Sequence, residues 1–286
     1  MSGAARAGAP AAQEQLPGMP ARLFSCTPSK LTAYLACPRR YRMTYLDRPS
    51  PPRGPAFAHT SMGAAVHLAL ARWWSEPPAG RTPAAAVRLV RGVWSSAGFR
   101  DEEQSAEHRG RAERSVAAYT AALDPHQEPV GVERTVATRT AVLAVSGRVD
   151  RLDRRGDELV VVDYKLGRRA PEDADARSSL ALALYALAAG RTLRTRCRRV
   201  ELHHLPSGTR AVAEHDEASV ARKVTEAESL ARDAVRAQDA VAAGADPDAA
   251  FPATPSRLCA WCDLRASCPA GRATGPAAKP WAALEP

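Results

Sequence analysis

"GRVDRLDRRGDELVVVDYKLG", residues 147–167, decides the fold, because it predicts two β-strands joined by a tight turn. Gly156-Asp157 is a favourable pair for a two-residue hairpin loop. With that loop, Asp150 on the first strand lies directly opposite Asp163 on the second. A three-residue loop would shift the register by one residue, so the pairing of the two acids depends on the length of the loop.

Two acids and a lysine meet on one face of this hairpin. Asp163 and Lys165 are two residues apart in a strand, so their side chains project from the same face, and Asp150 shares it. Facing carboxylates repel each other unless a cation lies between them, and Mg²⁺ or Mn²⁺ takes such oxygen ligands. The three residues therefore predict metal-assisted hydrolysis of a phosphodiester. A surface hairpin that carries a lysine–aspartate pair is the alternative.

The rest of the sequence predicts an α/β domain. Valine- and threonine-rich runs between turn residues predict strands, and apolar residues at helical spacing predict helices. The expected helices cover residues 29–46, 62–76, 82–97, 101–123, 172–189 and 216–243, and the expected strands cover residues 130–138, 141–153, 158–166, 198–205 and 210–214. Helices followed by a strand meander, a helix and more strands favour a mixed sheet flanked by helices.

The composition favours a polyanionic partner and argues against a membrane span. The net charge is +9 and the isoelectric point about 9.6, which suits nucleic acid or an anionic membrane surface, although a coding bias toward arginine would give the same charge. No apolar run approaches the ~20 residues that a membrane span needs. Residues 1–22 lack the apolar core of a secretory signal, so we expect a disordered arm on a cytoplasmic protein without membrane partners.

Four of the six cysteines have a spacing typical of a metal centre. Cys259, Cys262 and Cys268 form a Cys-x2-Cys-x5-Cys run, and Cys37 is a candidate fourth ligand far upstream. Four thiolates select zinc or an iron–sulfur cluster, and local zinc sites usually have two close pairs of cysteines. Cys26 lies close enough to Cys37 to compete as the fourth ligand. The two cysteines expected to be structural thiols are Cys26 and Cys197.

The chain resembles the PD-(D/E)XK nuclease superfamily and, within it, the RecB-like exonuclease family. The resemblance is carried by "GRVDRL" and "VVDYKLG" on the two strands, by "GAAVHLAL" on a helix and by "TPSKLTAYLACPRRYRMTYL" near the start, and it covers about residues 24–269. It implies a restriction-endonuclease-like core, in which helices flank a central mixed sheet. It also implies a Mg²⁺- or Mn²⁺-dependent DNA nuclease, an exonuclease that acts on single strands or DNA ends.

The resemblance assigns roles to the residues of the site. It implies four metal ligands: Asp150, Asp163, the carbonyl of Tyr164 and His67. Lys165 would orient the attacking water, and Glu133 lies on the preceding strand, where relatives often carry an acid. A partly exposed helix histidine is the alternative interpretation of His67.

The cysteine spacing extends the resemblance to relatives with an iron–sulfur clasp, such as the AddB nuclease domain and the CRISPR-adaptation nucleases. By that resemblance a [4Fe–4S] cluster, with Zn²⁺ as the alternative, is held by Cys37, Cys259, Cys262 and Cys268. The implied organisation is a disordered arm (residues 1–22), one nuclease domain (residues 23–269) and a flexible tail (residues 270–286). Within the domain, a helical part covers residues 29–123, the nuclease core covers residues 130–243 and a cysteine-rich segment covers residues 251–269.

The helix expected after Lys165 departs from the family pattern. Relatives often carry a glutamine four residues before a tyrosine there, and this chain has Tyr185 but Ala181. Arg177, one turn earlier, could take the place of the glutamine, or it could be a solvated surface arginine. The missing glutamine favours an alternative function, a catalytically weak DNA-binding module of the same fold within a repair complex.

Basic residues beside these motifs predict the DNA interface. They are Arg39, Arg40, Arg42, Arg168 and Arg169, with Tyr41 and Tyr45 interleaved. A cationic groove with aromatic platforms suits single-stranded DNA, although the two tyrosines could instead pack a helix. The sequence has no phosphate-binding Gly-x4-Gly-Lys-Ser/Thr motif, so a helicase partner would be a separate chain. DNA repair and CRISPR adaptation are both open as pathways.

Overall fold

A single mixed sheet organises the computed structural model, which describes residues 23–285. Its strands, in chain order, are β1 (Phe24–Cys26), β2 (Gly131–Arg139), β3 (Leu143–Arg155), β4 (Glu158–Lys165), β5 (Cys197–His204) and β6 (Thr209–Glu214). Their order across the sheet is β1-β3-β4-β5-β6, and β2 pairs with β3 outside that path. β1–β3 and β4–β5 are parallel and the other pairs antiparallel, so the predicted mixed sheet is confirmed. The arm predicted over residues 1–22 lies outside the described residues.

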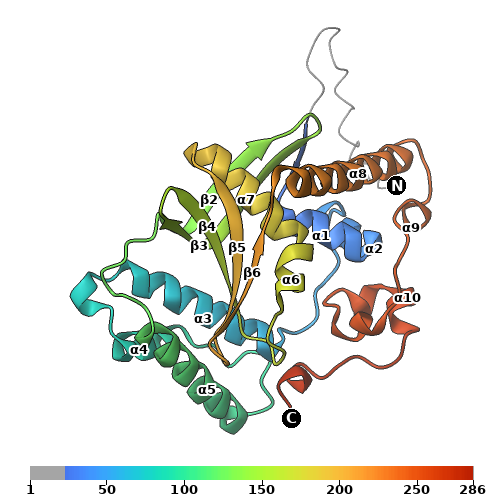
Figure 1. Ribbon diagram of the computed structural model, residues 1–286. Helices are drawn as coiled ribbons and strands as arrows, with labels where there is room; N and C mark the ends of the chain where they lie inside the picture. The colour runs from blue at the N-terminus through green and yellow to red at the C-terminus, as the bar shows by residue number, and fades with distance from the viewer. Residues whose placement is uncertain (1–22, 286) are drawn as a thin grey trace, which may run out of the picture.

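Helices cover both faces of this sheet (Figure 1). They are α1 (Pro28–Ala36), α2 (Pro38–Tyr45), α3 (Ala58–Ser75), α4 (Pro83–Val93), α5 (Glu102–Ala121), α6 (Asp173–Ser178), α7 (Leu180–Leu193), α8 (Glu217–Ala242), α9 (Pro247–Ala250) and α10 (Pro269–Arg272). Val160 and Val162 of β4 pack on α3, α4 and α5, whereas Leu159 and Val161 pack on α7. The apolar run of β4 is thus buried on both faces, as in a central strand. None of the described helices is long and apolar enough to cross a membrane.

Two of the predicted helices are each split in the structure. The helix predicted over residues 29–46 is α1 and α2, because Cys37 is extended, with φ −165° and ψ 107°, and the proline after it begins a new helix. The helix predicted over residues 172–189 is α6 and α7, which meet at Ser179. The hydroxyl of Ser179 accepts a hydrogen bond from the N–H of Leu182 and caps α7. The strand β1 was not predicted, since three residues carry no readable alternation.

The β3–β4 hairpin has the predicted two-residue turn. β3 ends and β4 begins on either side of Gly156-Asp157, and Gly156 has a left-handed φ of +62°, which such turns require. The register pairs Arg151 with Val162. The ladder ends there, and Asp150 and Asp163 are the next residues of the two strands, close enough for the charge of Asp150 to raise the pKa of Asp163.

A chain of buried polar side chains lies between the sheet and α5. Arg151 of β3 is only 2% exposed, and its guanidinium contacts Asp153 at 2.8 Å. The same guanidinium donates to the hydroxyl of Tyr119 at 3.0 Å and to that of Tyr164 at 3.3 Å. The hydroxyl of Tyr119 also lies 2.7 Å from Nδ1 of His203 on β5. These contacts hold the part of β4 that carries Tyr164 against α5.

Glu201 ends this chain of contacts on β5. Its side chain is 1% exposed, and it accepts hydrogen bonds from His203 at 2.8 Å, Arg155 at 2.5 and 2.9 Å, and Arg199 at 2.7 Å. Burial opposes ionisation of Glu201, but these hydrogen bonds outweigh burial and lower the pKa of its carboxyl group. Burial lowers the pKa of His203, so the neutral ring donates from Nε2 to the carboxylate and accepts at Nδ1 from Tyr119.

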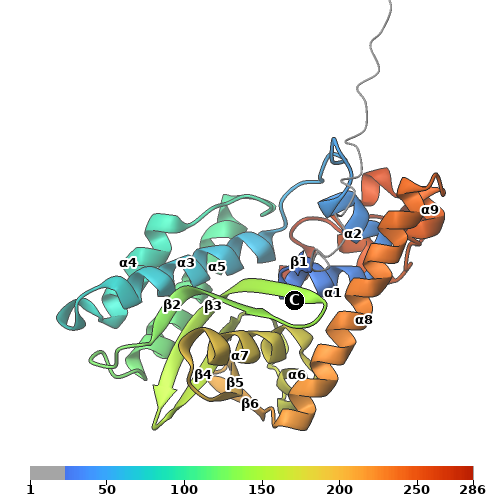
Figure 2. The same ribbon diagram turned by 90° about the horizontal axis from the view of Figure 1, so that it is seen from above.

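The first and last segments of the described chain lie against each other (Figure 2). Tyr41 of α2 stacks on Phe251, with ring centroids 6.2 Å apart. Asp248 of α9 pairs with Arg39 at 3.2 Å and with Arg42 at 2.9 Å. Tyr41 is completely buried, so its ring packs the helices together and is not a platform for bases.

The C-terminal segment predicted to be a flexible tail, residues 270–286, packs on the domain as far as residue 285. A short 3-10 helix, Ala282–Leu284, lies in this segment. The N–H of Ala58 in α3 donates to the carbonyl of Pro280 at 3.0 Å. Arg168 donates to the carbonyl of Glu285 at 2.7 Å. The segment therefore lies beside α3 and the end of β4.

We expect Glu201→Gln to lower the free energy of unfolding by about 1.5–3 kcal/mol at neutral pH, because its buried carboxylate accepts charge-assisted hydrogen bonds from Arg155 and Arg199, two partly exposed side chains. The lowered pKa of Glu201 means that its carboxylate stabilises the fold fully above the ordinary glutamate pKa of ~4.3, and this contribution is lost as pH falls toward the folded-state pKa. Urea unfolding across a pH series measures the effect. The difference between wild type and variant should narrow in acid.

The matched control is Glu214→Gln, an acid on β6 whose side chain is 64% exposed and lies 3.9 Å from Arg199. That substitution should change stability little, because exposed ion pairs contribute little. A Glu201→Gln protein as stable as the control at neutral pH would contradict the role given to Glu201.

Candidate metal centre

The three residues predicted to meet on the hairpin do so. Asp150 Oδ2 accepts a hydrogen bond from the backbone N–H of Tyr164 at 3.0 Å, which ties the carboxylate to the end of β4. Lys165 Nζ lies 2.5 Å from Asp163 Oδ2. His67 of α3 reaches the same place, with Nδ1 3.2 Å from Asp150 Oδ2. The structure therefore brings a helix histidine to a pair of facing strand carboxylates.

Glu133 of β2 joins this cluster through an unusual backbone conformation. Its φ is +47°, in the left-handed region that few residues other than glycine adopt. β2 and β3 pair on both sides of Glu133 and Asp150, which face each other between two paired positions. Glu133 Oε2 lies 2.6 Å from Nε of Arg148. Backbone strain of this kind concentrates at functional sites, where the surrounding structure holds it.

His67, Glu133 and Asp150 together fit a metal ion. Each offers one ligand atom, and these atoms lie within 4.8 Å of one another. In residues 23–285 no other set of three histidine, cysteine or acidic side chains does so. One nitrogen and several carboxylate oxygens suit a divalent cation such as Mn²⁺ or Mg²⁺.

The electrostatics of the site point the same way. Burial lowers the pKa of His67, but the hydrogen bond to Asp150 and the charges of Asp150 and Asp163 outweigh burial, so the pKa is raised. Burial raises the pKa of Asp163, and the charge of Asp150 raises it further. The charge of Lys165 lowers it, but the pKa stays above the ordinary aspartate value. The charge of Asp150 thus opposes ionisation of Asp163, and a bound cation would relieve the repulsion between the two carboxylates.

Tyr185 of α7 lies beside the carboxylates, and Gly147 makes room for it. A Cβ atom on Gly147 would come within 2.6 Å of Cε1 of Tyr185. Burial raises the pKa of the Tyr185 hydroxyl, and the charges of Asp163 and Asp150 raise it further. Ala181 precedes Tyr185 by one turn on the same helix.

Arg177, a candidate replacement for the missing glutamine or else a surface arginine, lies away from the carboxylates. It is on α6, and it lines a pocket with Arg198 of β5, Glu214 of β6 and Lys223 of α8. Arg198 is near the start of β5, whereas Lys165 pairs with the last residue of that strand. The structure therefore does not bring Arg177 to the carboxylates, since its neighbours lie toward the opposite end of the sheet.

A cavity of about 530 Å³ opens beside the metal ligands. Its walls come from α3, the end of β4 and two C-terminal segments, and they include His59, His67, Lys165, Arg168 and Trp261. The ring of Trp261 lies 5.6 Å from that of His59. Trp261, which sequence reasoning missed, thus brings the cysteine-rich segment to the edge of the site. Trp261 was missed because a single tryptophan forms no sequence pattern that indicates a site.

The predicted DNA-binding arginines divide into two groups. Only Arg168 lines the cavity beside Lys165. Arg39 and Arg42 are mostly buried in their ion pairs with Asp248, so they hold α2 against α9. The other two also have acidic partners: Arg40 is 3.4 Å from Asp263, and Arg169 is 2.9 Å from Asp175. The roles of Arg39 and Arg42 as DNA contacts stay a prediction, and in the structure Asp248, distant in sequence, pairs with both.

Among the predicted cluster ligands, the structure places Cys37 near Cys262. Cys262 lies close enough to Cys37 for the charge of Cys37 to raise its pKa, although burial is the larger cause. In the described chain, no three cysteine sulfurs lie within 4.8 Å of one another, whereas tetrahedral zinc would hold its sulfurs about 3.8 Å apart. Burial raises the pKa of Cys26 to about 11 and that of Cys197 to about 12, so both stay protonated.

A comparison with protein families gives one match, to the family model of the PD-(D/E)XK nuclease superfamily, over residues 25–269. No curated protein matches the chain. The match covers the described hairpin, α3 and the cysteine-rich segment, and it confirms the resemblance at the level of the superfamily. The sheet flanked by helices agrees with the restriction-endonuclease-like fold of that superfamily.

Mn²⁺ should raise the melting temperature of the wild-type chain, because an ion that binds the folded state shifts unfolding by mass action. Asp150→Asn should abolish most of that rise, since it removes the charge that faces both His67 and Glu133. Differential scanning calorimetry with and without Mn²⁺ measures the shift. Asp157→Asn, in the exposed hairpin turn, is the control and should keep it. An equal rise in both variants would contradict the metal site.

Proposed function

Since the chain belongs to the PD-(D/E)XK nuclease superfamily, we propose that it is a Mg²⁺- or Mn²⁺-dependent deoxyribonuclease, an exonuclease on single strands or DNA ends. Members of this superfamily are typically metal-dependent nucleases. The observation that carries the proposal is the convergence of four functional side chains, His67, Glu133, Asp150 and Asp163, beside a lysine.

His67, Glu133 and Asp150 would hold the ion, with Asp163 and the carbonyl of Tyr164 as the remaining ligands. The ligand atoms of the first three already lie within 4.8 Å of one another, so little rearrangement is needed. When bound, a divalent ion supplies Lewis-acid stabilisation of the phosphate and lowers the pKa of a nearby water.

Lys165 orients the attacking water and stabilises the charge that develops on the phosphate. Its side chain is 46% exposed, but its ammonium is held by Asp163 at 2.5 Å, next to the proposed ligands. A cation fixed in a partly buried site stabilises developing charge better than a mobile one, because it needs no reorganisation. Tyr185 packs beside the same carboxylates and supports their position.

The cavity next to Lys165 is the proposed entry for the DNA strand. Arg168 supplies a positive charge at its wall, and Trp261 and His59 supply aromatic rings on which bases could stack. This combination supports a single strand or a frayed end as the substrate, in DNA repair or CRISPR adaptation.

We further propose that Cys37, Cys259, Cys262 and Cys268 hold a [4Fe–4S] cluster, with Zn²⁺ as the alternative. The N–H of Gly54 donates to the carbonyl of Asp263 at 2.7 Å, and Arg40 and Arg53 pair with the carboxylate of Asp263. These contacts hold the Cys37 segment against the segment that carries Cys262. The cytoplasm, where thiols stay reduced, would suit such a site.

A catalytically weak DNA-binding module is the second candidate function, and Ala181 favours it. The family position that often carries glutamine has no polar group here, and Arg177 does not replace it. A weak module would bind DNA as the enzyme does but would cleave it slowly even with Mn²⁺.

Asp163→Asn and Lys165→Ala should each lower cleavage of end-labelled single-stranded DNA by orders of magnitude in Mg²⁺ or Mn²⁺. Binding should persist in both variants, because Asp163 does not line the entry cavity and Arg168 keeps a positive charge at its wall when Lys165 is removed. Gel analysis of the labelled products, with Asp157→Asn as the control, measures the rates. If the Asp163→Asn protein cuts at the wild-type rate, the assignment of the active site is wrong; if wild-type protein binds DNA without cutting it, the weak module is correct.

Cys37→Ala and Cys259→Ala should both remove the iron and lower the melting temperature, because a shared cluster joins the two ends of the domain and its binding stabilises the fold. Cys26→Ala and Cys197→Ala are the controls and should keep the iron. Metal analysis and melting of anaerobically purified protein test this. Zinc without iron in the wild type would exclude the cluster, and iron retained in Cys37→Ala but lost in Cys26→Ala would move the fourth ligand to Cys26.

A further inference from the structure

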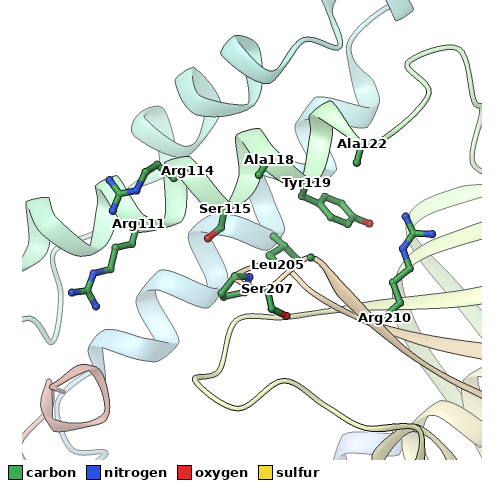
Figure 3. Close-up of a pocket in the computed structure, with 11 residues that line it drawn as sticks. Arg111, Arg114, Ser115, Ala118, Tyr119, Ala122, Leu205, Ser207 and Arg210 are labelled. Carbon is green, nitrogen blue, oxygen red and sulfur yellow. The ribbon is translucent and has the colours of Figure 1, made fainter.

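A second basic pocket lies between α5 and the turn that joins β5 to β6 (Figure 3). Its volume is about 530 Å³, and three arginines line it: Arg111 and Arg114 from α5 and Arg210 from β6. No acidic residue lines the pocket. The floor is apolar, with the ring of Tyr119 and the side chain of Leu205. An elongated apolar floor between basic ends suits a ligand with a flat body and separated negative charges.

Among the described residues, two of the three arginines have no acidic partner. Arg111 pairs with Glu107 at 2.5 Å on the exposed face of α5. Arg114 and Arg210 form no ion pair and no side-chain hydrogen bond within residues 23–285. Figure 3 shows Arg111 and Arg114 at one end of the pocket and Arg210 at the other. A guanidinium presents its N–H groups as a fork that matches phosphate oxygens.

The wall of the pocket is rigid. The hydroxyl of Tyr119 is held by His203 at 2.7 Å and by Arg151 at 3.0 Å, both of them buried. On the opposite side, the hydroxyl of Ser207 lies 2.7 Å from Nδ1 of His204 and 2.7 Å from Oγ1 of Thr209. The pocket therefore keeps its shape without a ligand, which lowers the entropic cost of binding.

The pocket lies at the same end of the sheet as the catalytic residues. Lys165 pairs with His204 of β5, which pairs with Thr209 of β6, next to Arg210. The N–H of Leu205 also donates to the carbonyl of Lys165 at 3.0 Å. Thr209 thus lies two strand spacings, about 10 Å, from Lys165. Arg210 pairs with His203, which pairs with Tyr164, so Arg210 lies on the α5 face, and a strand reaches it from Lys165 by passing round this end of the sheet. One single strand can therefore contact both Lys165 and the pocket, because basic grooves of this kind follow a strand over several nucleotides.

We propose that this pocket is a second phosphate-binding subsite for the DNA strand whose scissile bond lies at Lys165. Arg210 would bind the phosphate nearer to the reacting one, and Arg114 a phosphate farther along. The inference rests on the proposed nuclease function and adds to it a length requirement, since a substrate too short to reach the pocket loses these contacts.

The test is the double variant Arg114→Ala/Arg210→Ala, measured on a single strand of about 30 nucleotides and on a dinucleotide with one phosphodiester. Binding of the long strand should weaken several-fold, and its dependence on salt should fall by about 1.4 in log–log slope, for two lost phosphate contacts. The ratio of kcat/KM on the long strand to that on the dinucleotide should fall as well. Arg154→Ala/Arg222→Ala removes the same charge from exposed arginines elsewhere and should change neither quantity.

If the two double variants behave alike on the long strand, the subsite is wrong while the nuclease function stands. If the wild-type chain neither binds nor cuts either DNA with Mg²⁺ or Mn²⁺, the proposed function fails and the subsite fails with it. A lower salt slope and a lower ratio in Arg114→Ala/Arg210→Ala alone support the subsite.

Discussion

The register of the β3–β4 hairpin is the constraint on which the rest of the site depends. Side chains alternate along a strand, so a slip of one residue would turn Asp150 to the α5 side and leave Asp163 without its facing acid. The two-residue turn at Gly156-Asp157 prevents that slip. The hydrogen bond from the N–H of Tyr164 to Asp150 then locks the acid in place at 3.0 Å. The placement of the two acids is thus a consequence of one turn.

One face of the hairpin anchors the strands to α5, and the other carries the acids of the metal site. On the α5 side, Arg151 links Tyr164 to Tyr119 through buried hydrogen bonds, and this holds the end of β4 against the helix. On the other side, Asp150 and Asp163 face each other near Tyr185, where a bound cation would neutralise their repulsion. Buried charged networks of this kind are costly unless every group has a partner, and here they fix the position of the strand that carries the lysine.

The parts of the site that follow from local rules could be predicted from the sequence. Period-two alternation and one favourable turn were enough to bring Asp150 and Asp163 together, and a helix histidine beside them followed from the family resemblance. The left-handed backbone of Glu133 could not be predicted, because no local rule gives φ of +47° to a glutamate within a strand. The ion pairs of Arg39 and Arg42 were missed for another reason. Their partner Asp248 is 206 residues from Arg42, and in sequence a paired arginine looks the same as a free one.

The central claim is that the hairpin acids, His67 and Glu133 form one metal site. Anomalous X-ray diffraction at the manganese edge, from crystals of the full chain grown with Mn²⁺, tests it most directly. The account predicts a single strong peak within bonding distance of Asp150, His67 and Glu133, beside the end of β4. Crystals saturated with Mn²⁺ that give no peak there, or a peak held by other residues, would contradict it.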